Sequence, residues 1–186
     1  VGRMEQLTEE QLDEPTDDTS GEAGAPAAAT RLVRWEDFEG AEPELAAAVR
    51  ARFEAFRHHV LATLRRDGAP RVAGTEVAIH HGDLTIGSMW RSAKALDLLR
   101  DGRYALHANP GDGSMEGGDS KVAGVAVEMT GAARDRYVEE VDPPTPFHLF
   151  RLDVAQVVHS TIHPDGDRMV IHSWRPGRGV TRVERR

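Results

Sequence analysis

The sequence predicts an α+β protein in which six or seven short antiparallel strands form a barrel flanked by two helices. Short apolar segments follow one another between Asp-Gly and other turn signals, which is typical of antiparallel strands. Two segments carry apolar residues at helical spacing. The 186 residues contain no internal repeat and match the length of one domain with a tail.

The N-terminal part differs in composition from the rest of the chain. Residues 1–22 hold eight acidic residues against Arg3, which accounts for −7 of the net charge of −8 and leaves the rest nearly neutral. Residues 1–30 combine these acids with Thr, Ser, Gly and Pro and offer almost nothing to bury, so we expect a disordered acidic tail. Residues 31–186 are the predicted barrel domain.

The composition also excludes several classes of function. Without cysteine, the chain has no disulfide, thiolate nucleophile, iron–sulfur cluster or Cys-based zinc site. The nearly neutral body argues against nucleic-acid binding, which concentrates positive charge on one face. No apolar run approaches the roughly 18 residues of a membrane span, and no signal-peptide core follows the N-terminus, so we expect a cytoplasmic protein without a membrane partner.

The first half of the barrel domain begins near Trp35 and Phe38. Apolar residues at helical spacing, with Pro43 in the first turn, predict a helix over 43–56. Three strands follow at 60–65, 70–80 and 84–89, separated by the turn signals Asp67-Gly68 and His81-Gly82-Asp83.

The second half begins with a helix that Ser92 can cap and Asp101-Gly102 ends. A strand over 103–108 and a polar loop over 109–120 come next. Three prolines forbid regular structure in the connection after the fifth strand: Pro143, Pro144 and Pro146. The later strands are predicted over 122–133, within 147–163 and over 169–174.

Motifs for several kinds of chemistry are missing or weak. There is no phosphate-cradling Gly-Lys-Ser or Gly-Lys-Thr loop, no Gly-x-Ser-x-Gly elbow and no His-Glu-x-x-His helix. The nine histidines include two adjacent pairs, His58-His59 and His80-His81. Because adjacent residues on a strand face opposite sides, we expect neither pair to bind one ion, and we predict no metal site.

The start of the second helix is a candidate anion site. Arg91, Ser92 and Lys94 stand there directly after a strand. Free backbone N–H groups and the helix dipole favour an anion at that position, and cations are unfavourable there without one. Lys94 is one of two lysines among 23 basic residues, so composition alone does not account for it. The alternative is that both cations are solvated surface charges.

A glycine in the preceding hairpin favours a ligand. Gly74 shares one face of its predicted strand with Val72 and Glu76. Glycine weakens a strand interior, and a frequent reason for it is the close approach of a ligand or of another backbone. A flat ring would fit beside Gly74, and Gly87 on the neighbouring strand could widen the space.

Four segments, in this order, resemble the pyridoxamine 5′-phosphate oxidase-like flavoproteins. They are Val60-Leu61-Ala62-Thr63-Leu64, Asp67-Gly68-Ala69-Pro70-Arg71-Val72, Gly82-Asp83-Leu84-Thr85-Ile86 and Ala93-Lys94-Ala95-Leu96-Asp97-Leu98-Leu99-Arg100-Asp101-Gly102-Arg103. The resemblance covers roughly residues 53–175. It implies a six- to seven-stranded antiparallel split β-barrel with flanking helices, and a homodimer that binds FMN, or the deazaflavin coenzyme F-420, at the subunit interface.

The resemblance also implies a set of cofactor-binding residues. By position, Gly74, Thr75 and Glu76 would line the isoalloxazine ring, and Gly87, Ser88 and Met89 would flank the ring and the ribityl chain. Ser92 and Lys94, helped by Arg91, would hold the phosphate. Trp174 falls near the end of the last predicted strand, where family members often bring a residue from the partner subunit.

We therefore expect a flavoprotein oxidoreductase that transfers hydride to or from a small-molecule substrate. The cofactor would carry this chemistry, and no side chain in the sequence must act as an acid or base, so no catalytic residue is assigned. Two alternatives remain open at this point. One is a non-catalytic flavin- or haem-binding carrier or sensor, and the other is an unliganded split barrel that works in regulation.

Overall fold

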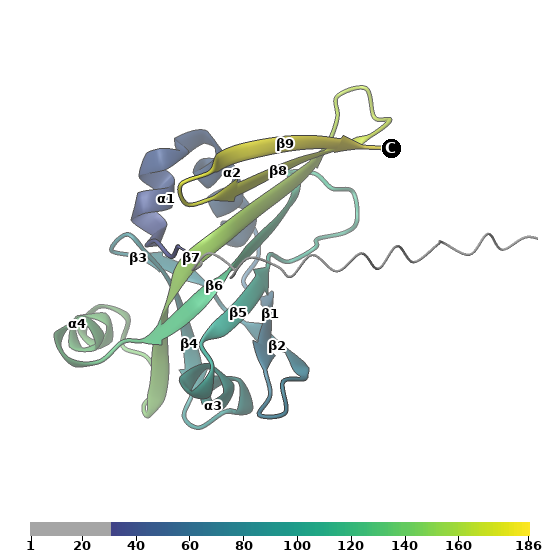
Figure 1. The fold of residues 1–186 in the computed structure, drawn as a ribbon. Coiled ribbons are helices and arrows are strands. Elements are labelled where there is room, and N and C mark those ends of the chain that lie inside the picture. Colours follow the sequence, from purple (N-terminus) through teal and green to yellow (C-terminus); the bar gives the residue numbers. More distant parts are fainter. Residues whose placement is uncertain (1–30) are drawn as a thin grey trace, which may run out of the picture.

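The computed structural model describes residues 31–186, which form four helices and nine strands (Figure 1). The predicted acidic tail, 1–30, lies outside the described residues. The helices are α1 (Trp35–Ala41), α2 (Pro43–Glu54), α3 (Ala93–Arg100) and α4 (Gly131–Val141). The strands are β1 (His59–Leu64), β2 (Pro70–Thr75), β3 (Ala78–His80), β4 (Asp83–Met89), β5 (Arg103–His107), β6 (Asp119–Glu128), β7 (Phe147–Ile162), β8 (Met169–Arg175) and β9 (Gly179–Arg185).

The strands form one antiparallel sheet that curls round without closing. Its hydrogen-bonded order is β2-β1-β5-β6-β7-β4-β3, and β8 and β9 extend the sheet from β7. The two end strands of this path, β2 and β3, are consecutive in the chain and are joined by Glu76 and Val77. The barrel is therefore split between β2 and β3, which confirms the predicted α+β split-barrel fold.

Strand β7 is the longest element and connects the two parts of the sheet. Its first residues, from Phe147 to Arg151, pair with β4, and its last residues, from Val157 to Ile162, pair with β8. Strand β6 runs along nearly all of its other edge. Because β7 is buried at alternate positions along most of its length, it contributes to the barrel core and to the sheet extension together.

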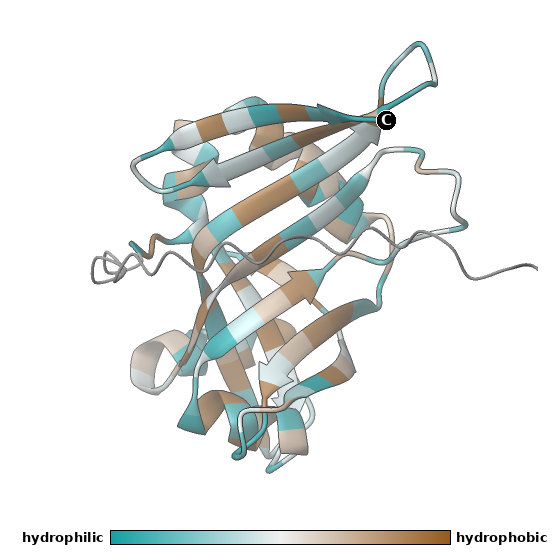
Figure 2. Ribbon diagram, turned by 45° about the vertical axis from the view of Figure 1, so that its right-hand side comes forward, coloured by the Kyte–Doolittle hydropathy of each residue, from teal (hydrophilic) through white to brown (hydrophobic). Residues whose placement is uncertain are grey.

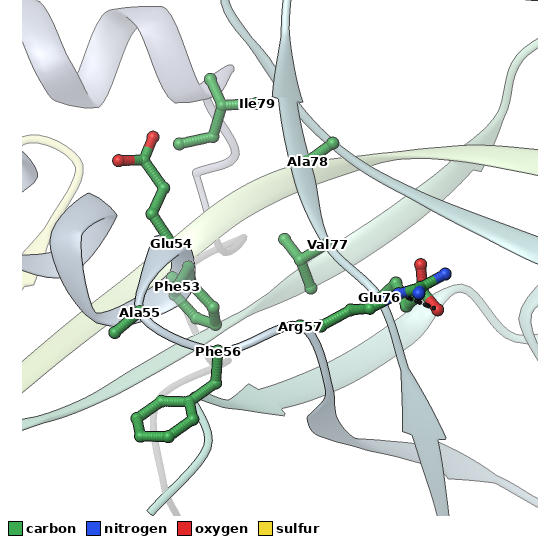
Figure 3. A pocket seen from close by; sticks show the side chains of 9 residues that line it. All are labelled: Phe53, Glu54, Ala55, Phe56, Arg57, Glu76, Val77, Ala78 and Ile79. Carbon is green, nitrogen blue, oxygen red and sulfur yellow. Dashed lines mark ion pairs between the residues drawn. The ribbon is translucent and has the colours of Figure 1, made fainter. Parts of the chain in front are cut away.

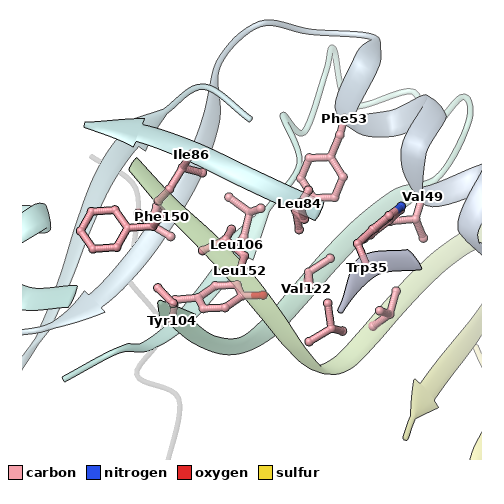
Figure 4. Close-up of a cluster of buried hydrophobic side chains, with 14 of the residues drawn as sticks. Trp35, Val49, Phe53, Leu84, Ile86, Tyr104, Leu106, Val122, Phe150 and Leu152 are labelled. Atoms are coloured by element: carbon pink, nitrogen blue, oxygen red, sulfur yellow. The ribbon is translucent and has the colours of Figure 1, made fainter. Parts of the chain in front are cut away.

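The hydrophobic core fills the barrel and continues under α1 and α2. Hydrophobic and hydrophilic residues alternate along the strands, as expected for a sheet with one face on the core (Figure 2). In the core, side chains from the strands meet aromatic side chains from α1 and α2 (Figure 4). Trp35 and Phe38 are fully buried and meet edge to face, with ring centroids 5.2 Å apart.

Two predicted strands need correction, and three elements, α1, α4 and β9, were not expected. The strand expected over 70–80 is divided into β2 and β3 at Glu76 and Val77, because its two parts pair with different strands. The strand expected over 122–133 ends at Glu128, and α4 follows it. Within the described residues, no helix is long and apolar enough to cross a membrane.

Candidate functional site

A cavity of about 750 Å³ opens beside the split in the barrel. Strands β2 and β4, the start of α3 and the segment from α4 to β7 line it. This volume is within the range of small-molecule and cofactor sites. Seven of the ten residues predicted to bind a cofactor line this cavity: Gly74, Thr75, Glu76, Gly87, Ser88, Met89 and Lys94.

The two glycines of the cavity are not explained by the fold of this chain. Neither Gly74 nor Gly87 has a positive φ, so an L-residue could adopt the same backbone. A Cβ atom added at either position would meet nothing within 4 Å in the part of the chain that the structure describes. Gly124, in contrast, is required by packing, because a Cβ there would lie 1.9 Å from the Asp153 carbonyl oxygen. At these two positions the cavity wall is therefore bare backbone, with free space where a side chain would otherwise project.

Lys94 brings a positive charge to the cavity from the first turn of α3. Its Nζ donates a hydrogen bond to the Gly74 carbonyl oxygen at 2.6 Å, which ties α3 to the end of β2. Burial lowers the pKa of Lys94, and the charge of Glu76 opposes that shift. An anion in the cavity would stabilise the ammonium against this desolvation.

Two of the three predicted phosphate-binding residues, Ser92 and Arg91, do not line the cavity. Ser92 is the N-cap of α3: its Oγ accepts from the Ala95 N–H at 3.4 Å and lies 2.7 Å from the Ser88 Oγ. Arg91 is exposed, with a φ of 55° in the link between β4 and α3. Neither residue lines the cavity, so Lys94 is the cation that reaches it from this helix start.

The structure separates Trp174 from the other predicted residues. Its ring is 4% exposed and packs against Phe38 in the core, with ring centroids 4.7 Å apart. Within residues 31–186 the indole lies in the core and not in the cavity. The expectation that Trp174 serves the site of a partner subunit stays a prediction.

Sequence reasoning did not find several lining residues. Arg57 and His58, between α2 and β1, lie 2.9 Å and 3.6 Å from the Glu76 carboxylate. The Arg57–Glu76 pair also borders a smaller cavity of about 470 Å³ under the end of α2 (Figure 3). Tyr137 from α4 and Phe147 from β7 also line the larger cavity. The sequence carried no motif for these residues, since the fold brings them together from separate elements.

Exposed apolar side chains lie next to the cavity, at its edge and on the strands around Gly74. Val60 and Val72 lie on the outer face of β1 and β2, and Val72 is 71% exposed. Met89, at the end of β4, is 79% exposed and lines the cavity itself. Large apolar groups rimmed by polar ones commonly mark a binding surface.

The chain has the fold of the pyridoxamine 5′-phosphate oxidase-like split barrels. PhzG from Burkholderia lata, solved in complex with tetrahydrophenazine-1-carboxylic acid, is 15% identical over 82% of this chain and 93% of its own, with a TM-score of 0.58. A pyridoxamine 5′-phosphate oxidase-related, FMN-binding protein from Nostoc punctiforme is 15% identical over 78% of this chain and 96% of its own, with a TM-score of 0.57.

A protein of unknown function from Agrobacterium tumefaciens, Atu2129, is 22% identical over 64% of this chain and 57% of its own, with a TM-score of 0.51. No protein-family model matches this chain, and no curated protein matches it. The likeness to the solved structures therefore concerns the fold, and the resemblance noted in the sequence is confirmed at that level.

Proposed function

We propose that the chain binds FMN in the cavity beside the split and acts as a flavin-dependent oxidoreductase on a small molecule. The observation that carries this proposal is the pair of open glycines, Gly74 and Gly87, in a cavity that also holds a half-buried lysine. A flat ring needs a wall without side chains, and a phosphate needs a cation. The Nostoc protein with the same fold is described as FMN-binding.

The residues present fit this cofactor. The ring would lie against the backbone at Gly74 and Gly87, and Lys94 would offset the charge of the phosphate. When bound, FMN supplies the hydride-transfer chemistry. Burial raises the pKa of Tyr137, with a further contribution from the charge of Glu76, so its hydroxyl stays protonated at neutral pH and can donate a hydrogen bond to a substrate in the cavity.

We also propose that the protein works as a homodimer with the cavity near the interface. Val60, Val72 and Met89 expose apolar surface beside the cavity, and a second copy would cover it. Sedimentation at micromolar concentration should give about twice the 20.4 kDa mass of the chain. Val72→Glu should shift the protein to monomer and weaken flavin binding together. A parent protein that sediments as a monomer contradicts this arrangement.

The flavin site is tested by filling the space beside the glycines. The doubly substituted chain Gly74→Ala/Gly87→Ala should melt at or above the parent temperature, since nothing in residues 31–186 meets the new methyl groups. It should bind FMN about 5- to 150-fold more weakly, the effect of overpacking by about 1–3 kcal/mol. Gly40→Ala is the matched control, because a Cβ at Gly40 also meets nothing within 4 Å and lies away from the cavity. Equal FMN affinity in all three proteins would exclude a ring at these glycines.

The oxidoreductase part of the proposal has its own test. In the FMN-loaded protein, the visible flavin absorption should bleach on reduction with NADH or NADPH and return when a candidate acceptor is added. A flavin that stays bound but does not change its oxidation state in the presence of such reductants and acceptors would favour the carrier alternative.

A further inference from the structure

Three side chains that could hold one metal ion meet at the outer side of the cavity wall. They are His80 at the end of β3, His81 in the β3–β4 turn and Glu140 in the last turn of α4. Figure 1 labels β3 and α4, the two elements that this cluster joins. The Nε2 atoms of both histidines point at the same carboxylate, with distances to the Glu140 Oε2 of 2.8 Å from His80 and 2.9 Å from His81.

The backbone explains how adjacent histidines come to the same side. His80 is the last residue of β3, and His81 has left the strand, with a φ of 48° in the left-handed region. This change turns the second side chain toward the first, so that the two ring centroids are 4.4 Å apart. Neighbouring side chains diverge only where both residues lie on a strand, and His81 lies outside β3, so His80 and His81 come together against expectation.

The contacts within the cluster satisfy His81, whose Nε2 lies within hydrogen-bond distance of both Glu140 oxygens, but not His80. The His80 Nε2 is buried and makes no hydrogen bond of adequate geometry within residues 31–186, although it lies 2.8 Å from Glu140. An imidazole nitrogen that is buried without a hydrogen-bond partner is destabilising, and a metal ion would supply the missing interaction.

We propose that His80, His81 and Glu140 bind a divalent transition-metal ion of the Zn²⁺ type. Two imidazoles and a carboxylate form a donor set that suits Zn²⁺, with water as the fourth ligand. With bonds of about 2.0–2.2 Å and tetrahedral angles, neighbouring ligand atoms stand about 3.3–3.6 Å apart. The contacts of 2.8 and 2.9 Å therefore need to open by roughly half an ångström to admit the ion. His81 and Glu140 are about half exposed, which gives the ion a path from solvent.

A metal ion at this place would fix one wall of the cavity. No residue of α4 is buried, so the helix is held by few contacts. One of them is Tyr137, which lines the cavity and meets the His80 ring edge to face at 5.3 Å. The chain that follows Glu140, from Val141 onward, also lines the cavity. The ion would thus join the β3–β4 turn to α4 and limit the movement of this wall, whatever the cavity holds.

A second cluster of similar composition serves as the comparison. His163, Asp165 and Asp167 also lie close enough to share an ion. There, however, the Arg168 guanidinium already contacts all three, at 2.8 Å from His163, 3.4 Å from Asp165 and 2.5 Å from Asp167. A cation of the chain occupies the position that a metal would need, so we expect no binding at this cluster.

Metal uptake by the full chain, with any purification tag removed and without added flavin, tests the proposal. Co²⁺ added to the chelator-treated protein should produce the visible absorption of a tetrahedral site at one equivalent per chain, and Zn²⁺ should displace it. Hydrogen exchange in α4 should slow when Zn²⁺ is present. Absence of Co²⁺ absorption and of Zn²⁺ uptake by calorimetry would overturn the proposal, and it would leave the flavin proposal untouched.

Three variants locate the site. Loss of a residue that only supports a metal ligand weakens metal binding about 10- to 100-fold. Glu140→Gln and His81→Asn each remove a ligand itself, so each should weaken Zn²⁺ binding by more than this. Asn tolerates the left-handed backbone at position 81, and both positions are substantially exposed, so the metal-free variants should melt like the parent. His163→Gln should bind Zn²⁺ as the parent does. Loss of binding in His163→Gln with retention in the other two would assign the ion to the second cluster and refute the proposal.

Discussion

Replacing Lys94 by alanine separates a phosphate-binding role from a purely structural one. In the chain without ligand, the substitution removes the 2.6 Å hydrogen bond from the Lys94 Nζ to the Gly74 carbonyl oxygen. Loss of such a bond destabilises by about 0.5–1.5 kcal/mol. Alanine is the better helix former by a few tenths of a kcal/mol, and burial of the ammonium is relieved. We therefore expect the free energy of unfolding to fall by at most about 1 kcal/mol.

The effect on flavin binding should be larger and should depend on the phosphate. A charge-assisted hydrogen bond to a phosphate contributes about 1.5–3 kcal/mol, so Lys94→Ala should weaken FMN binding about 10- to 150-fold. Riboflavin has the same ring and ribityl chain without the phosphate. The affinity of Lys94→Ala for riboflavin should be close to that of the parent protein. The preference of the parent protein for FMN over riboflavin should therefore largely disappear in the variant.

Fluorescence titration of both flavins into both proteins measures this difference. Lys121→Ala is the matched control, because the other lysine pairs with Asp119 on β6 and does not line the cavity. Titration with the deazaflavin coenzyme F-420 shows which of the two cofactors the cavity prefers. Unchanged FMN affinity in Lys94→Ala, or an equal loss for FMN and riboflavin, would refute the assignment of Lys94 to the phosphate.

Three further predictions concern the fold. Asp97→Asn should destabilise the protein by about 3 kcal/mol in urea unfolding, because it removes the charge partner of Arg71. The Arg71 Nε lies 2.6 Å from the buried Asp97 carboxylate. A loss of stability below about 1 kcal/mol would contradict this prediction. Gly124→Ala should lower stability by about 3 kcal/mol or more, since its Cβ would overlap the Asp153 carbonyl oxygen, and a melting temperature equal to that of the parent would exclude the close approach. Burial lowers the pKa of His159 in the folded chain. Below pH about 6.5, the ordinary pKa of histidine, the unfolded chain therefore binds more protons than the folded one. The free energy of unfolding should be constant with respect to this group above that pH and should fall below it. The fall should be smaller in His159→Gln, and an equal fall in both proteins would count against this role.

The local signals in the sequence predicted the parts of the fold whose causes are local. Ser92 caps α3 as expected, and Asp67-Gly68 forms the turn between β1 and β2. Helix α2 begins at Pro43, which needs no hydrogen-bond donor there. In each case a single residue type meets a requirement of the backbone at that position, so the sequence pattern is enough.

The elements that were missed depend on contacts that are distant in sequence. Helix α1 has only seven residues and is fixed by Trp35 and Phe38, whose partners lie far along the chain. Helix α4 buries no residue, so no apolar period indicates it. Strand β9 is exposed along most of its length and pairs only with β8, which hides the alternation expected of a strand.

The candidate site shows the same division between local and distant causes. Periodicity placed Gly74 and Gly87 where a ligand could approach, and the structure brings both to one cavity with Lys94. The residues contributed by α4 and by the loop before β7 could not be found, since their place depends on the packing of a polar helix. A position near the end of a strand does not determine which face a side chain joins, and the Trp174 side chain lies in the core of its own chain.

The split between β2 and β3 has a consequence for how this scaffold can change. The two strands at this seam are connected by Glu76 and Val77 and not by a ladder of interstrand hydrogen bonds. Widening the seam by an ångström therefore breaks no such bond, whereas the same movement between β6 and β7 would strain a ladder that spans β6. Substitutions in this two-residue connection can adjust the cavity to ligands of different thickness while the ladders that stabilise the barrel stay intact. A seam of this kind allows new ligand preferences to evolve at little expense of stability.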